Sequence, residues 1–176
     1  FVMQNPDSQT VCDKVSAELA FGLESFGVKS GEIQSRVGEM AAFFGIEPLY
    51  DRDISTLSGG QKQLVGLCSV MATDPDILLL DEPTAQLDPV AARELLGILD
   101  RLNKEMGVTI IIAEHDPEEL FDSCDKILYL AKGKTEFFGT PALTAKYFVE
   151  NALEGFLPET AKAFARLCDD LPINVR

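Results

Sequence analysis

The chain has 176 residues, of which 46% are hydrophobic and 25% are charged, a balance that is typical of a globular protein with a buried core. Aspartate and glutamate number 29 against 15 lysines and arginines, and the formal charge of -14 disfavours binding to nucleic acid or to an anionic membrane surface. No run of about 18 apolar residues predicts a membrane span, no N-terminal pattern predicts a signal peptide, and the four cysteines lack metal-ligand spacing.

Short helices dominate the first part of the predicted secondary structure. Residues 1–4 resemble the end of an apolar strand, so the sequence is expected to start within a fold. Apolar residues then recur at helical spacing in residues 10–26 and 30–45, which predicts a small helical subdomain. The stripe of the first helix consists of Val11, Val15, Leu19 and Leu23. A third helix is expected to begin at Ser58–Gly60 and to end before Asp74.

Continuous apolar runs then replace the helical pattern. Residues 77–80 and 108–113 are short and rich in branched side chains, which is typical of parallel strands that are buried on both faces. A helix that begins after Asp88 and ends at Gly107 is expected to connect them as a parallel crossover.

The last part of the chain predicts a different arrangement. Residues 126–138 have the pattern of an antiparallel hairpin. Thr140 and Pro141 are expected to open a helix that runs to about Leu153, and residues 157–176 are expected to be helical.

Two adjacent carboxylates follow the first apolar run. Asp81 and Glu82 stand where residues 77–80 reach the carboxyl edge of the predicted sheet, and ligands of open α/β sheets bind at that edge. Since neighbouring side chains of a strand point in opposite directions, one carboxylate can hold Mg²⁺ while the other faces a water molecule. The alternative, two solvated acids in a turn, is disfavoured by Pro83 and by residues 85–88.

A glycine-rich turn opens the third helix within the heptapeptide of residues 57–63. Its free N–H groups and the positive end of the helix dipole form an anion site that suits a terminal phosphate, and the glycines allow close approach of the backbone. An isolated Ser-Gly-Gly is more often an ordinary helix N-cap, and that interpretation stays open for the tripeptide alone.

Two further polar residues lie at predicted strand exits. His115, the one histidine of the chain, can contact a phosphate oxygen or orient a water, although a lone histidine is ordinarily a hydrogen-bonded packing residue. Gln4 offers a neutral amide that can coordinate Mg²⁺ or its water. Each of these signals is weak by itself.

Together these segments resemble the motifs of ABC ATPases. The Q-loop, signature, Walker B and switch-histidine motifs correspond to Gln4, Leu57–Gln61, Ile77–Thr84 and His115. The resemblance implies an α/β P-loop NTPase core of ABC type, with a mostly parallel sheet and a small helical subdomain. A finer similarity, to the cassettes of energy-coupling-factor and cobalt-type importers, is carried by Gln4–Asp7 and Ala20–Glu24.

The resemblance also predicts a division of the chain. A Q-loop segment (1–9) is followed by a helical subdomain (10–56), a catalytic core with signature, Walker B, D-loop and switch histidine (57–140), and a C-terminal helical tail (141–176). The Walker A sequence GxxxxGK[ST] is absent from the 176 residues. The N-terminal strands and the Walker A loop are therefore expected to be missing from this fragment, and the isolated polypeptide is expected to be inactive, because that loop is the principal grip on the β- and γ-phosphates.

Roles for single residues follow from the resemblance. Asp81, with Gln4, is expected to bind Mg²⁺, and Glu82 to act as the general base for the water that attacks ATP. His115 is expected to sense the γ-phosphate. Four residues are expected to contact ATP bound by the opposite cassette of a dimer: Ser58, Gly59, Gly60 and Gln61. Asp88 is expected to couple the two sites.

Partners follow in the same way. A second cassette is expected, as a homodimer, a heterodimer or a second cassette in the same chain. A transmembrane transporter subunit is expected to dock on the helical subdomain, to which Gln4 would link the metal site, and no nucleic acid is expected. The protein is thus expected at the cytoplasmic face of the cell membrane, as a peripheral subunit.

The predicted function is ATP hydrolysis in the full-length protein that powers uptake of a small solute such as a metal ion or a vitamin. One alternative is a non-transport ABC ATPase that acts on nucleic acid or ribosomes. Low basicity argues against it, and the stretch from Gln4 to Leu57 is too short for the long coiled coils of chromosome-type members. The other alternative is a non-catalytic ABC-like module, against which the retained Glu82, His115 and signature argue.

Overall fold

The computed structural model describes residues 1–115, 120–121 and 123–162. The chain falls into two units, Phe1–Glu114 and His115–Arg176, each with its own set of packed elements. The predicted boundaries at residues 9, 56 and 140 remain a proposal about domains.

The N-terminal residues add a short third segment beside the sheet of the first unit. Val2 forms a parallel bridge with Leu80, in which the Val2 N–H donates to the Leu79 carbonyl at 2.8 Å. The Asp81 N–H donates in turn to the Val2 carbonyl at 3.2 Å. The predicted strand end is therefore present as a single parallel bridge at Val2, and residues 1–4 form no strand of their own. Helix α1 (Pro6–Gln9) follows directly.

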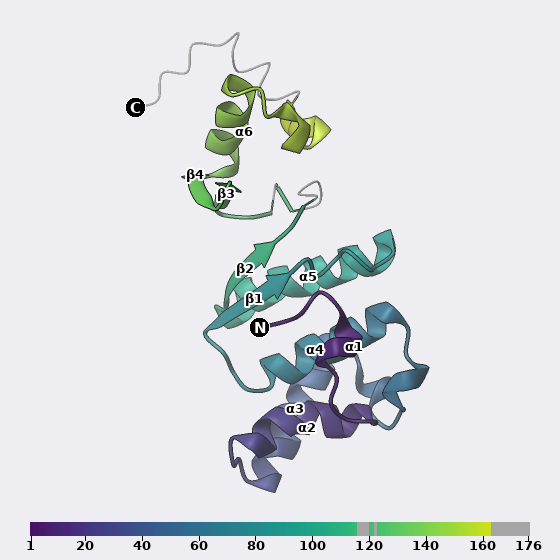
Figure 1. Ribbon diagram of the computed structural model, residues 1–176. Helices are drawn as coiled ribbons and strands as arrows, with labels where there is room; N and C mark the ends of the chain where they lie inside the picture. Colours follow the sequence, from purple (N-terminus) through teal and green to yellow (C-terminus); the bar gives the residue numbers. More distant parts are fainter. Residues whose placement is uncertain (116–119, 122, 163–176) are drawn as a thin grey trace. The chain divides into compact units, whose positions relative to one another are not determined.

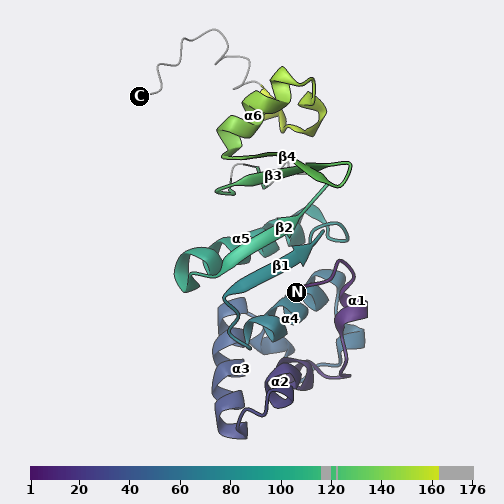
Figure 2. The same ribbon diagram turned by 60° about the vertical axis from the view of Figure 1, so that its left-hand side comes forward.

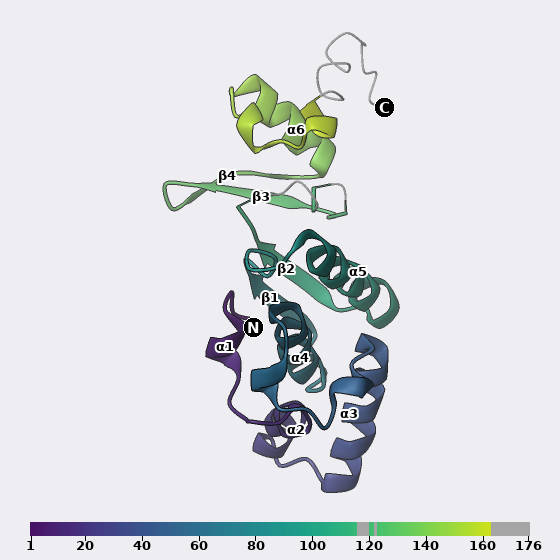
Figure 3. The same ribbon diagram turned by 90° about the vertical axis from the view of Figure 1, so that its right-hand side faces the viewer.

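The first four helices of this unit pack around α4. Helix α4 (Gly59–Met71) packs against α2 (Val15–Ser25), α3 (Ser30–Phe44) and α1, as Figure 3 shows. Two short 3-10 turns, Glu47–Leu49 and Ile54–Thr56, connect α3 to α4. The buried residues of the two predicted stripes are Val15, Leu19, Leu23, Ile33, Val37, Ala41 and Phe44.

The predicted start of the first helix, at residue 10, is wrong. Val11 is 66% exposed and lies in an extended stretch before α2, which begins only at Val15. The buried carboxylate of Glu18 holds this stretch, because its Oε2 accepts hydrogen bonds from the N–H groups of Val11 at 3.0 Å and Cys12 at 2.8 Å. Side chain to backbone bonding thus replaces the first helical turn.

The sheet of the first unit pairs two strands in parallel. Strand β1 (Ile77–Asp81) runs beside β2 (Thr109–Ala113), with Asp81 opposite Ala113, and α5 (Pro89–Met106) connects them (Figures 1 and 2). The side chain of Asp88 caps the start of α5, and Gly107 ends it in the left-handed conformation. The parallel pair and the limits of its connecting helix agree with the prediction.

The prediction that both faces of these strands are buried is wrong. Leu78 and Leu80 share a core with residues of α4 and α5, whereas Ile77 is 55% and Ile111 55% exposed on the strands. The burial of β1 alternates along the strand, because within the described residues only one face of the sheet is covered by helices.

The second unit contains a hairpin and a helix. Strands β3 (Ile127–Ala131) and β4 (Lys134–Gly139) are antiparallel, as predicted. Helix α6 (Pro141–Glu150) begins at its cap Thr140, ends three residues before the predicted Leu153, and is followed by a 3-10 turn at Glu154–Phe156. The buried hydrophobic cluster of this unit consists of Phe121, Ala145, Phe148, Leu157 and Ala161. Residues 163–176, the last part of the predicted helical tail, lie outside the described residues.

Among the described residues, no helix combines the length and the apolar character that a membrane crossing requires.

Candidate functional site

The carboxyl end of β1 brings together the predicted acid pair. Asp81 is the last residue of the strand, is exposed, and its carboxylate makes no hydrogen bond or ion pair with the described residues. Glu82 follows it, half-buried, with a φ of 44°, and its N–H donates to the Ala113 carbonyl at 2.9 Å. The backbone turns at Glu82, so the two carboxylates leave the strand in different settings.

Gln4, near the N-terminus of the chain, contacts the carboxyl end of β1. Its Nε2 donates a hydrogen bond to Glu82 Oε2 at 2.5 Å, across 78 positions of sequence. Two motifs that the sequence places far apart, the predicted Q-loop and Walker B residues, are therefore in contact. This contact depends on the Val2–Leu80 bridge, which sets Gln4 beside the end of β1.

The donor atoms at this edge suit Mg²⁺. Magnesium prefers oxygen ligands, keeps several waters, and is commonly held by one or two carboxylates together with substrate phosphates. Asp81 supplies a carboxylate that no described residue pairs with, and Gln4 turns its amide nitrogen to Glu82, which leaves its amide oxygen as an acceptor. Within the described residues, no three His, Cys, Asp or Glu side chains form a complete metal cluster. The edge fits a hydrated ion shared with phosphate better than a closed protein cage.

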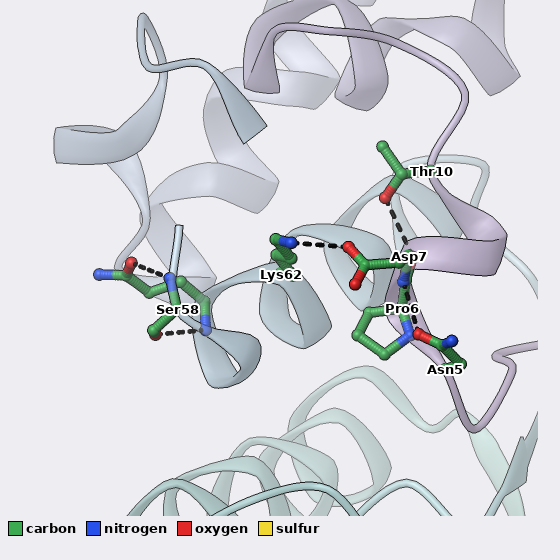
Figure 4. Close-up of polar contacts among 7 residues, drawn as sticks. Asn5, Pro6, Asp7, Thr10, Ser58 and Lys62 are labelled. Carbon is green, nitrogen blue, oxygen red and sulfur yellow. Dashed lines mark hydrogen bonds and ion pairs between the residues drawn. The ribbon is translucent and has the colours of Figure 1, made fainter. Parts of the chain in front are cut away.

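The start of α4 is a capping box. Ser58 Oγ accepts a hydrogen bond from the Gln61 N–H at 3.3 Å, and Gln61 Oε1 accepts one from the Ser58 N–H at 3.0 Å (Figure 4). The N–H groups of Gly59 and Gly60, in the first helical turn, have no acceptor within the helix. The N-cap interpretation is thus satisfied, and these two N–H groups remain suited to an anion.

The two glycines of this turn differ in their surroundings. A Cβ added to Gly60 would lie 3.1 Å from the Cβ of Ala91 on α5, whereas a Cβ added to Gly59 would meet no described residue within 4 Å. Close packing of α4 against α5 therefore explains Gly60. Packing within the described residues does not explain Gly59.

Asp88 caps α5 beside this contact. Its Oδ1 accepts hydrogen bonds from the N–H groups of Val90 at 2.9 Å and Ala91 at 3.1 Å. The bond from Ala91 and then the bond from Val90 lower the pKa of the Asp88 carboxyl below its ordinary value. The cap is a sufficient structural reason for the aspartate, and its predicted coupling role stays a prediction.

His115 is exposed and is the first residue of the second unit, directly after Glu114. Its predicted contact with phosphate stays a prediction.

Several contacts around the site were missed from the sequence. Lys62 Nζ lies 2.6 Å from Asp7 Oδ1, which ties α4 to α1 (Figure 4). Gln9 accepts a hydrogen bond from the Met3 N–H at 3.0 Å through Oε1, and its Nε2 donates to the Gly66 carbonyl at 3.4 Å. Opposite charges near two motifs were visible in the sequence, but their pairing was not.

A second contact that the sequence did not reveal lies in the turn that follows Asp81 and Glu82. Thr84 donates from both its N–H and its hydroxyl to Glu114 Oε1, at 3.3 and 2.7 Å. The position of Glu114, between an apolar strand and His115, was the available signal for it.

An acidic hollow opens near α1. It has a volume of about 600 Å³, and its lining includes Asp7, Asp13 and Asp53 together with Lys62. Three carboxylates against one ammonium give this surface a negative charge.

Comparison by sequence finds relatives along the whole chain. A family model described as ABC transporter matches residues 2–85. A protein named as an ABC transporter ATP-binding protein in Bacillus thuringiensis subsp. konkukian is 42% identical over 177 residues, which cover 99% of this chain and 32% of that protein. The energy-coupling factor transporter ATP-binding protein EcfA1 of Symbiobacterium thermophilum is 39% identical, over 94% of this chain and 58% of that protein.

Comparison by structure agrees. The chain superimposes on cbiO1 from Clostridium perfringens, described as part of the ABC transporter complex cbiONQ, with a TM-score of 0.77 and 34% identity. The match covers 93% of this chain and 65% of that one. The chain thus spans less than a third of the first relative and less than two thirds of the other two proteins.

Proposed function

Because the chain is related in sequence and in fold to the ATP-binding proteins of ABC transporters, we propose that it forms part of an ATP-hydrolysing transport cassette. The observation that carries the proposal is the contact of Gln4 with Glu82 beside Asp81, because it joins two distant motifs at the edge where ligands of α/β sheets bind. Hydrolysis of a phosphoanhydride needs a positioned water and neutralised charge more than covalent help.

Each residue of the predicted catalytic and metal set has one task in this proposal. Asp81 and the amide oxygen of Gln4 hold Mg²⁺, which when bound neutralises charge on the phosphate oxygens. Glu82 accepts a proton from the attacking water, and its bond from Gln4 orients the carboxylate. His115 contacts the γ-phosphate.

The start of α4 acts on a different nucleotide. Ser58, Gly59, Gly60 and Gln61 contact ATP held by the opposite cassette of a dimer, and Asp88 couples the two sites. The unobstructed space at Gly59 supports this role, because it leaves the helix N-terminus accessible to an anion. The second cassette belongs to a homodimer, a heterodimer or the same chain.

The transported substrate is a small solute such as a metal ion or a vitamin, and the protein acts at the cytoplasmic face of the membrane. The likeness to EcfA1 and cbiO1 supports this class of importer. The acidic hollow near α1 is the proposed binding site for a basic segment of a transmembrane subunit, because Asp7, Asp13 and Asp53 line it.

The test is Glu82→Gln in the full-length gene product that contains this sequence. We expect ATP hydrolysis to fall by at least a hundredfold, because the general base is lost, while the affinity for ATP stays within about twofold. Steady-state hydrolysis and calorimetric titration with Mg-ATP measure the two effects. A matched control is Glu105→Gln on the exposed face of α5, which should leave both unchanged. Undiminished turnover in Glu82→Gln would remove Glu82 as the base.

A further inference from the structure

We propose that Glu114 and Thr84 form a positioning clamp for Glu82, an inference that rests on the proposed function. Neither residue belongs to the predicted site set, and both lie in the first unit. The clamp joins the turn after β1 to the end of β2, 30 positions apart in sequence.

The contact is specific in geometry. Glu114 Oε1 accepts two hydrogen bonds from one residue, from the Thr84 hydroxyl at 2.7 Å and from the Thr84 N–H at 3.3 Å. Both side chains are half-buried, so the bonds are shielded in part from water. A carboxylate acceptor makes such bonds shorter and stronger than a neutral one would.

Glu82 requires this support because its own backbone is unfavourable. Its φ of 44° falls in the left-handed region, which residues with a side chain rarely adopt. The next residue is Pro83, which restricts Glu82 further by steric conflict with its backbone. Such a conformation persists only where the surrounding structure determines it.

The supporting contacts come from both sides of Glu82. Its N–H donates to the carbonyl of Ala113, the residue before Glu114, and its carbonyl accepts the N–H of Ala85 at 3.2 Å. Thr84 lies within this turn, so the bond to Glu114 fixes the turn to the same strand end that holds the Glu82 N–H. Without the clamp, the turn is no longer fixed to the end of β2, and the orientation of the Glu82 carboxylate is no longer determined.

Glu114 is proposed to act through Thr84 and not on the substrate, because its Oε1 accepts both hydrogen bonds from Thr84. This role predicts a loss in the chemical step without a matching loss in substrate binding. An acceptor oxygen at residue 114 should be enough for much of the effect, so an amide should replace the carboxylate in part.

The experiment compares Glu114→Ala, Glu114→Gln and Thr84→Val in the full-length gene product, with wild type, Glu82→Gln and Glu105→Ala beside them. We expect Glu114→Ala to lower kcat by roughly tenfold to a hundredfold, the range that follows from misplacing a catalytic group. The KM for Mg-ATP should change by less than about twofold, and Glu114→Gln should recover kcat to within about threefold of wild type. Thr84→Val should lower kcat in the same direction, and the double variant with Glu114→Ala should be no slower than Glu114→Ala alone.

Three results would overturn the clamp while leaving the proposed function in place. These are wild-type kcat in Glu114→Ala, a Glu114→Gln variant as slow as Glu114→Ala, and losses in the double variant that multiply. Thermal unfolding checks each fold, and if Glu114→Ala does not fold, Thr84→Val and Glu114→Gln decide the matter. If wild type hydrolysed ATP no faster than Glu82→Gln, the proposed function would be rejected, and the catalytic role of the clamp with it.

Discussion

The end of β1 and the start of α4 contain most of the predicted site residues, but they are held together in different ways. At the end of β1, the bonds join residues far apart in sequence, Gln4 to Glu82 and Thr84 to Glu114. At the start of α4, the side chains of the capping residues Ser58 and Gln61 bond to each other's backbone N–H groups. The second kind of bond stabilises the start of a helix, whereas local structure does not require the first kind. Side-chain substitutions at the two places therefore test different things.

The largest effect that separates the two regions should come from Gly59→Asp. Aspartate is favourable in the first turn of a helix, and the space at Gly59 is open, so folding should be unimpaired. A carboxylate there repels phosphate, and we expect hydrolysis by the full-length gene product to fall by about a hundredfold.

The matched control is Gly59→Asn, which has nearly the same shape without the charge and should keep more activity than Gly59→Asp. Equal activity of wild type and Gly59→Asp would show that the start of α4 is only a helix cap.

A smaller effect is expected at Gln4. Gln4→Met keeps the length of the side chain but removes both the bond to Glu82 and the oxygen offered to Mg²⁺. We expect kcat to fall about tenfold and the Mg²⁺ concentration for half-maximal hydrolysis to rise, because a ligand and an orienting contact are lost together. Gln34→Met, on the exposed face of α3, is the control. A Mg²⁺ dependence identical to wild type in Gln4→Met would remove Gln4 from the metal site.

The smallest effect concerns stability at the start of α4. Ser58→Ala removes one half of the capping box and should lower the free energy of unfolding by about 1 kcal/mol. Ser30→Ala is the control, because Ser30 is the first residue of α3 and the N-cap of that helix, Lys29, makes no side-chain capping bond with the described residues. Urea unfolding measures both, and an equal loss in the two variants would contradict a capping role for Ser58.

What the sequence could predict were features that depend on neighbouring residues. Helix α4 begins after Ser58 and α5 after Asp88, because each side chain bonds to N–H groups two or three positions ahead. The parallel strands and the hairpin also follow from local patterns. The α/β fold and the resemblance to ABC ATPases, which rest on those patterns and on ordered motifs, are confirmed by the related proteins.

What the sequence could not predict were pairings across the fold. Glu18 turns its carboxylate back to Val11 and Cys12, which places Val11 outside the helix that its spacing predicts. The conformation of Glu82 was equally hidden, because a residue before proline is normally extended. The roles of the site residues remain proposals.

The most direct measurement applies to the homodimer and mixes two differently tagged copies of the full-length gene product, one with Glu82→Gln and one with Gly59→Asp, each inactive with itself. If the end of β1 and the start of α4 from different cassettes enclose each ATP, the mixed pair contains one intact site. ATP hydrolysis by the purified mixed pair should then reach the rate of a pair of wild type and Glu82→Gln. No recovery, with that reference pair active, would contradict the composite site.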